Sequence, residues 1–191
     1  MTTIGTDEIR TKGTNILAMV AALETARNAE LREVVVRDVP GEGGEEIRHK
    51  SIIAAGWYPI AWYRDLLQTI VTHATDPAII RELGRHSTRA NVPTIHRVFM
   101  KLISPHTLIK QGGRLFSSYF ENASVAIETV DKQVERITWK DCFGFDKNCW
   151  RDQVGSTEEL VVLSGAKVLR TKVLSGGENA DAAMVMDLAW R

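Results

Sequence analysis

The hydrophobic periodicity of this 191-residue chain changes once, near Ser124, and this change limits the folds that the chain can adopt. Before Ser124, apolar residues such as Ile16, Met19 and Leu23 recur three and four positions apart, which is the spacing of a helix with one buried face. After Ser124, apolar and polar residues alternate, and a polar turn at 131–133 leads into a second run, which indicates a β-hairpin. The sequence therefore predicts an α+β fold.

Prolines and capping residues mark the helix starts in the first part. Proline fits the first turn of a helix, and Asp, Asn and Ser side chains accept hydrogen bonds from its free N–H groups. Residues 30–39 favour a further helix despite three valines, and the glycine-rich run 40–44 is expected to be a loop. The other expected helices start at Asn15, Pro59, Asp76-Pro77, Pro93 and Ser104-Pro105.

The end of the chain predicts one more helix and a last strand. A capping box at Ser156 and Glu159 predicts that a helix begins there and continues through Leu169, until Gly176-Gly177 end it. The final segment alternates cleanly, which is typical of a half-buried strand. Its apolar face consists of Met184, Met186, Leu188 and Trp190.

These elements predict a helical N-terminal layer packed on a small antiparallel sheet, with strand-strand-helix-strand order in the C-terminal half. We expect a single domain over residues 1–191, because the length suits one compact unit and no long linker interrupts it. Within it we expect a flexible N-terminus at 1–12, a mainly helical part at 13–121 and the strand-strand-helix-strand part at 122–191.

Composition excludes several classes of protein. With 44% hydrophobic and 25% charged residues, the chain is unlike disordered, collagen-like or disulfide-scaffold proteins. Its apolar runs are too short to span a bilayer, so no membrane association is expected. The N-terminus lacks the pattern of a secretory signal, and two cysteines suit a reducing compartment, so a cytoplasmic location is the default expectation.

The zero net charge conceals a basic middle segment. Residues 81–114 contain 7 basic and 1 acidic side chains, a charge of +6, and the segments before and after carry −3 each. Basic residues recur every four positions there, so a helix would align them. Such rows could bind an acidic partner, but solvated faces or pairing within the chain is the simpler interpretation. Nucleic acid is not expected, since no reading motif is present. The candidate partner-binding residues are Arg81, Arg85, Arg89 and Lys101.

Motifs of catalysis and metal binding are missing from the sequence. It contains no phosphate-binding loop, dinucleotide fingerprint, HExxH, GxSxG or CxxC pattern. Cys142 and Cys149 are seven positions apart, which is not the close pair of a zinc site, and structural cysteines are the simpler interpretation. An enzyme using one of them as nucleophile is the alternative, and it requires a lowered thiol pKa. We expect no metal site and no enzyme activity.

Aromatic residues fall at helix starts and on helical faces. Core packing is the simpler interpretation of this pattern. The alternative is that part of the set lines an apolar ligand cavity between the helices and the sheet. The candidate lining residues are Trp57, Tyr58, Phe99, Phe116 and Tyr119, with His96 or Arg97 as the polar anchor.

The order of several short landmarks resembles a known family. It is similar to a family of bacterial proteins, most abundant in myxobacteria, that is distantly similar to 4-vinyl-reductase and haem–nitric-oxide-binding sensor domains. The match extends from about Gly13 to Trp190. The landmarks are Gly56-Trp57-Tyr58-Pro59, Glu82-Leu83-Gly84-Arg85, Phe99 through Ser104-Pro105, Leu115-Phe116-Ser117-Ser118-Tyr119 and Trp190.

The resemblance implies a sensor-like fold that binds small molecules, commonly as a dimer, and turns over no substrate. The chain departs from the pattern in two places. Residues 175–181 hold no cysteine where such sensors often have them, and Tyr119 is not followed by the serine and arginine that contact haem propionates in nitric-oxide sensors. No haem or other cofactor is therefore expected.

Two main hypotheses follow. The first is a non-enzymatic ligand-binding or signalling domain acting as a homodimer. The second is an interaction or assembly protein that binds an acidic partner through residues 81–114.

Overall fold

The chain folds into helices followed by an antiparallel sheet. The structure is a computed structural model that describes residues 9–27, 29–91 and 100–191. The helices are α1 (Gly13–Ala26), α2 (Ala29–Asp38), α3 (Gly41–Arg48), α4 (Ile60–Ala74), α5 (Ala78–Asn91), α7 (Pro105–Tyr119) and α8 (Lys147–Leu163). The strands are β1 (Arg10–Lys12), β2 (Trp57–Pro59), β3 (Ser124–Asp131), β4 (Val134–Lys140), β5 (Val168–Gly176) and β6 (Met184–Trp190).

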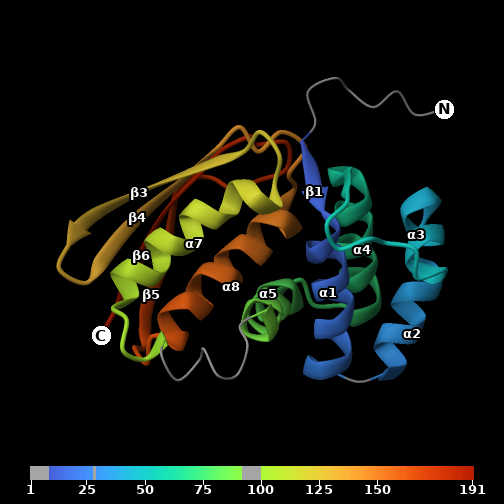
Figure 1. Ribbon diagram of the computed structural model, residues 1–191, viewed down its shortest axis with the longest axis horizontal. Helices are drawn as coiled ribbons and strands as arrows, with labels where there is room; N and C mark the ends of the chain where they lie inside the picture. The colour runs from blue at the N-terminus through green and yellow to red at the C-terminus, as the bar shows by residue number, and fades with distance from the viewer. Residues whose placement is uncertain (1–8, 28, 92–99) are drawn as a thin grey trace.

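The elements stack from the sheet outwards. Figure 1 shows the four-stranded sheet at one side, with α7 and α8 on its inner face, then α5, then α1 and α4, and finally α2 with α3. The strand order is β3-β4-β6-β5, and every neighbouring pair is antiparallel. The fold class is α+β, as predicted.

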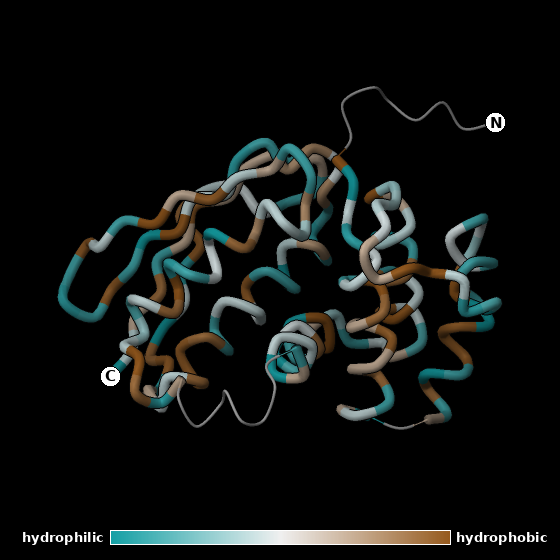
Figure 2. Tube along the Cα trace, viewed as in Figure 1, coloured by the Kyte–Doolittle hydropathy of each residue, from teal (hydrophilic) through white to brown (hydrophobic). Residues whose placement is uncertain are grey.

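The predicted hairpin and last strand are confirmed. β4 pairs with β6 in a register that sets Ile137 opposite Met186 and Trp139 opposite Met184. All four side chains are buried, and Leu188 extends the same face. The turn between β3 and β4 is hydrophilic along its tip (Figure 2). One face of the sheet therefore forms the floor of the core.

A short two-stranded sheet joins the two halves of the chain. β1 pairs with β2, and Thr11 also bridges to Phe120 at the end of α7. Arg10 forms an ion pair with Glu121 at 2.5 Å. We expected residues 1–12 to be a flexible terminus, but the structure places 10–12 in this strand, because Thr11 is fully buried and its backbone has partners on two sides.

Most of the predicted helix starts are confirmed. α4 begins after Pro59, and Asp76 Oδ1 accepts a hydrogen bond from the Ala78 N–H at the start of α5. Ser104 Oγ accepts one from the Thr107 N–H at the start of α7. The predicted helix at 30–39 corresponds to α2. The helix expected from Pro93 lies outside the described residues.

The start of α1 differs from the prediction. The helix begins at Gly13, so Asn15 lies within its first turn and is not the N-cap. Its amide donates to Thr11 Oγ1 at 3.0 Å instead.

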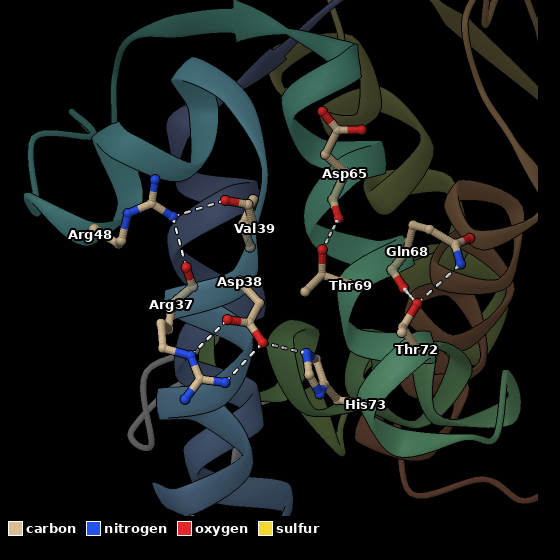
Figure 3. A network of polar contacts seen from close by, with 9 residues as sticks. All are labelled: Arg37, Asp38, Val39, Arg48, Asp65, Gln68, Thr69, Thr72 and His73. Atoms are coloured by element: carbon tan, nitrogen blue, oxygen red, sulfur yellow. Dashed lines mark hydrogen bonds and ion pairs between the residues drawn. The ribbon is translucent and has the colours of Figure 1, made fainter.

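In the glycine-rich run at 40–44, predicted to be a loop, Pro40 is the N-cap and residues 41–44 begin helix α3. Its glycines allow close packing: a Cβ at Gly43 would lie 2.5 Å from Trp62 Cγ, and one at Gly44 would lie 1.9 Å from the Val39 carbonyl oxygen. Arg48 at the other end donates to the carbonyls of Arg37 and Val39 at 3.0 and 2.8 Å (Figure 3). These tertiary contacts outweigh the poor helix propensity of glycine.

The helix predicted from Ser156 to 175 is wrong in both of its boundaries. α8 begins ten residues earlier, where Asp146 Oδ1 caps the N–H groups of Asn148 and Cys149 at 3.0 and 2.8 Å. It ends at Leu163, because Gly165 adopts φ +85°, and residues 168–176 form strand β5. The C-terminal half is therefore strand-strand-helix-strand-strand.

Two glycines allow α5 and α8 to cross in backbone contact. A Cβ at Gly155 would lie 2.0 Å from the Arg81 carbonyl oxygen, and a Cβ at Gly84 would lie 2.6 Å from the Asp152 carbonyl oxygen. No larger residue fits at either position without separation of the helices. The crossing fixes α8 between α5 and the sheet.

Substitution of Gly155 by alanine tests this crossing. We expect Gly155→Ala to lower the free energy of unfolding by about 1–3 kcal/mol, the usual cost of overpacking, although alanine favours helix by about 1 kcal/mol. Urea denaturation measures the change. The matched control is Gly112→Ala in α7, where the nearest atom is the terminal Cδ1 of Leu160, which can rotate away. Equal destabilisation by both substitutions would contradict the account.

Candidate functional site

A cavity of about 250 Å³ lies between the helices and the inner face of the sheet. Helix α7 and strands β3 and β4 form a largely apolar wall, and helices α4, α5 and α8 form a more polar one. The apolar wall includes Ile109, Phe116, Phe120, Val125, Ile127, Ile137 and Trp139. The other wall includes Tyr63, Ser87, Thr88, Asn91, Asp152, Gln153, Ser156 and Thr157, and Asn15 and Ala18 of α1 complete the lining.

Asp152 is the centre of the polar wall. Its Oδ2 accepts hydrogen bonds from the Tyr63 hydroxyl at 3.1 Å and the Gln153 amide at 3.0 Å. Its Oδ1 receives only a long contact of 3.4 Å from Ser156 Oγ. The side chain is buried, and this burial raises the pKa of Asp152 to about 6, although the three hydrogen bonds oppose the shift.

Of the seven predicted ligand-binding residues the structure describes four, and it brings two of these four to the cavity. Phe116 and Tyr119 line the cavity. Trp57 and Tyr58 lie in β2, outside the lining: Lys12 Nζ sits 3.9 Å from the Trp57 ring centre, and Tyr58 stacks on Trp62 with its hydroxyl accepting from the Ile53 N–H. These two residues therefore have structural contacts of their own. His96, Arg97 and Phe99 lie outside the described residues.

The predicted basic row is largely paired within the chain. Arg81 and Arg85 of α5 both bind Glu158 of α8, whose side chain is fully buried, and Arg89 binds Glu159 at 2.6 Å. Lys101 is exposed. Helix α5 therefore does not present a row of unpaired arginines to an acidic partner. Pairing within the chain, which was one of the simpler interpretations of the sequence, is confirmed for Arg81, Arg85 and Arg89.

The two cysteines do not suit nucleophilic chemistry. Cys142 and Cys149 are both fully buried. Burial raises the pKa of Cys142 to about 12 and that of Cys149 well above its usual value, so neither forms a thiolate near neutral pH. The hypothesis of a thiol-dependent enzyme required a lowered pKa, and this requirement is not met.

A larger hollow of about 630 Å³ lies at the surface, between α4 and the start of α8. Its lining combines charges of both signs, including Arg64, Asp65 and Arg151, with exposed residues such as Lys147. It lacks the apolar wall with a few convergent polar groups that characterises small-molecule sites. The smaller interior cavity is therefore the candidate site.

Comparison with known proteins identifies the fold. No family model matches the chain, and no curated protein matches it. Among solved structures, an H-NOX protein from S. oneidensis in the Fe(II)NO ligation state matches with a TM-score of 0.69 at 7% identity, covering 94% of this chain and 99% of that one. The Fe(II) unliganded H-NOX protein from K. algicida matches with 0.67 at 8%, covering 94% and 96%. The chain has the H-NOX fold.

A third match brings haem into consideration. This solved structure is described as "Modulating Heme Redox Potential Through Protein-Induced Porphyrin Distortion". It matches with a TM-score of 0.59 at 12% identity, and the match covers 94% of this chain and 99% of the other. Haem iron in proteins is held by His, Cys, Met or Tyr side chains. The residues of this cavity can be compared directly with that requirement.

The described lining does not fit haem. It contains no His, Cys or Met, and no Lys or Arg to pair with propionates. Of its two tyrosines, Tyr63 already donates its hydroxyl to Asp152. We derive no haem chemistry for this site.

Sequence reasoning missed the polar wall. Asp152 and Ser156 lie on α8, but the misplaced start of that helix separated them. One signal was available in the sequence. Asp152 and Ser156 are four positions apart, so a helix places them on one face, next to Cys149 and Trp150. Polar residues on an otherwise apolar helical face commonly line a binding site.

Substitution of Glu158 tests the pairing of α5 with α8. We expect Glu158→Gln to lower the free energy of unfolding by about 1–3 kcal/mol, because hydrogen bonds to charged groups are lost in a buried place. Burial disfavours ionisation of Glu158, but its bonds from Arg81, Thr171 and Arg85 outweigh this and lower its pKa below the ordinary 4.5. The stability that it contributes is therefore complete above about pH 4.5 and is lost as the pH falls through the lower, folded-state value.

Urea denaturation at pH 7 and at pH 3 measures both effects. The advantage of the wild type over Glu158→Gln should be smaller at the lower pH. The control is Glu178→Gln, which removes an exposed ion pair with Lys147 and should change stability by less than about 0.5 kcal/mol. A Glu158→Gln variant as stable as the control at pH 7 would refute the proposed pairing.

Proposed function

We propose that this chain is a non-enzymatic ligand-binding domain of sensor type, and that a small, largely apolar molecule occupies the cavity between helices and sheet. The observation that carries the proposal is the cavity itself, about 250 Å³ with one apolar wall and one polar wall. Drug-sized ligands occupy roughly 300–1,000 Å³, whereas an apolar cavity of about 150 Å³ already binds benzene. A molecule of one ring with a short polar substituent is the size that fits.

The position of the cavity supports a sensing role. Its lining comes from α1, α4, α5, α7, α8 and the sheet, so an occupant touches elements of both halves of the fold. A ligand shifts a conformational equilibrium only by its difference in affinity for the two states. A molecule that bridges the two walls favours whichever arrangement holds them at the right separation.

Several observations favour binding over catalysis. Both cysteines are buried with raised pKa values. Across the described ranges, no group of three or more His, Cys, Asp or Glu side chains is placed to hold a metal ion. The H-NOX fold itself is compatible with a sensor, and H-NOX proteins are the structures that the chain matches.

Two expectations from the sequence belong to this proposal. The family resemblance suggests a homodimer, and two cysteines in a chain of this length suit a reducing compartment such as the cytoplasm. In the described part of the chain, no helix has the length and apolar character needed to cross a membrane. Binding of an acidic partner through residues 81–114 is not carried forward, because Arg81, Arg85 and Arg89 bind glutamates of α8.

A cavity-filling substitution tests the proposal, with 2-phenylethanol as the probe. Ala18 of α1 lines the cavity, and Ala21 of the same helix is exposed. We expect wild type to bind the probe and Ala18→Leu to weaken binding about tenfold or more, because the added carbons occupy the ligand's space. Ala21→Leu is the matched control and should bind as wild type does. Isothermal titration calorimetry measures the affinities, and equal binding by the two variants would place the probe elsewhere.

A further inference from the structure

The buried carboxylates of α8 differ in whether they have a cationic partner. Glu158 has Arg81 and Arg85 as partners, and Glu159 has Arg89. Asp152, less than two turns earlier on the same helix, has none: its partners are the neutral donors Tyr63, Gln153 and Ser156. An ionised carboxylate buried without a cation is costly, and such groups are normally paired.

The side chain of Asp152 belongs to the cavity wall, and its two oxygens are bonded unequally. Oδ2 receives the two short hydrogen bonds, whereas Oδ1 has only the 3.4 Å contact with Ser156 Oγ, which also lies 3.3 Å from the Gly84 carbonyl oxygen. A Cβ at Gly84 would lie 2.8 Å from Oδ1, so only a glycine lets the backbone of α5 approach this oxygen, and it brings no charged partner. The carboxylate of Asp152 therefore lines the cavity with neutral hydrogen-bond donors as its only described partners.

The lining carries charge of one sign. Asp152 is the single carboxyl group among the described lining residues, and no Lys, Arg or His accompanies it there. A carboxylate ligand would be repelled by this site, whereas a cation would be attracted. The opposite wall is apolar, with Phe116, Ile127 and Trp139 available to enclose a ring.

From this arrangement we propose that the ligand is a small apolar amine whose protonated nitrogen donates to the Asp152 carboxylate while its hydrocarbon body packs against α7 and the sheet. This inference rests on the proposed function, since it names the class of molecule that fills the same cavity. An ammonium group supplies the cation that the described lining does not provide. The charge-assisted bond is stronger than any that a neutral donor could form with this carboxylate.

The pH dependence of binding follows from the groups that face Asp152. These are Tyr63 from α4, Ser87 and the Gly84 backbone from α5, and Cys149 from α8. Burial raises the pKa of both Tyr63 and Cys149 well above the usual values, so neither titrates near neutrality. Primary amines have a pKa of about 10 and stay protonated. Amine binding should therefore weaken as the pH falls through about 6, where Asp152 takes up a proton.

The experiment compares 2-phenylethylamine with 2-phenylethanol, two probes of one shape that differ in charge. Calorimetric titrations of each use wild type, Asp152→Asn and the control Asp65→Asn, which removes a partly buried carboxylate outside this cavity. We expect the amine to bind wild type and Asp65→Asn about tenfold or more tightly than the alcohol at pH 7.5. Asp152→Asn should remove this preference and keep alcohol binding.

The wild-type comparison does not depend on the folding of any variant. Equal affinities for amine and alcohol at pH 7.5, or an amine preference unchanged at pH 5, overturn the charge inference. If Ala18→Leu still abolishes alcohol binding in that case, the proposed function stands without it. Failure of both probes to bind wild type overturns both proposals.

Discussion

The close contact of α5 with α8 determines the rest of this structure. Gly84 and Gly155 let the two backbones touch, and buried ion pairs from Glu158 and Glu159 to arginines of α5 hold the helices in register. Glu158 also accepts a hydrogen bond from Thr171 of β5, so the same side chain ties the sheet to the helices. The position of α8 therefore sets which of its residues face the core and which face the cavity.

This constraint connects packing to the candidate site. With α8 fixed against α5, Asp152 and Ser156 face the space between the helical wall and the sheet. α7 closes the other side and brings apolar side chains with it. The fold is that of H-NOX proteins, but the described lining has neither the iron ligands nor the cations that haem requires. The cavity is therefore the place for which we propose a small ligand other than haem.

The sequence predicts the elements that depend on local chemistry. Asp76 and Ser104 act as helix caps as expected, and the alternation from Met184 to Trp190 corresponds to a strand with one buried face. Predictions fail where distant contacts outweigh local propensity. The glycines of α3 predict a loop by local propensity, but they form a helix because Trp62 of α4 packs against Gly43. The sequence around Ser156 predicts a helix N-cap there, but the N-cap of α8 is Asp146, ten residues earlier.

The candidate site was only partly predictable for the same reason. Phe116 and Tyr119 line the cavity as predicted, since both lie on an amphipathic helix whose capping was clear. Trp57 and Tyr58 belong to β2, whose pairing with residues far earlier in the chain leaves no local signal. The unpaired state of Asp152 depends on α4 and α5 together with α8, and no pattern within one segment contains that information.

Native mass spectrometry of the protein purified from its own cells tests the central claim most directly, because it reports bound small molecules and stoichiometry together. The account predicts that each 21.3 kDa chain carries a small amine that is released on collisional activation, with no haem. Haem bound in equal proportion to the chain, or a chain that carries no small molecule, would contradict it.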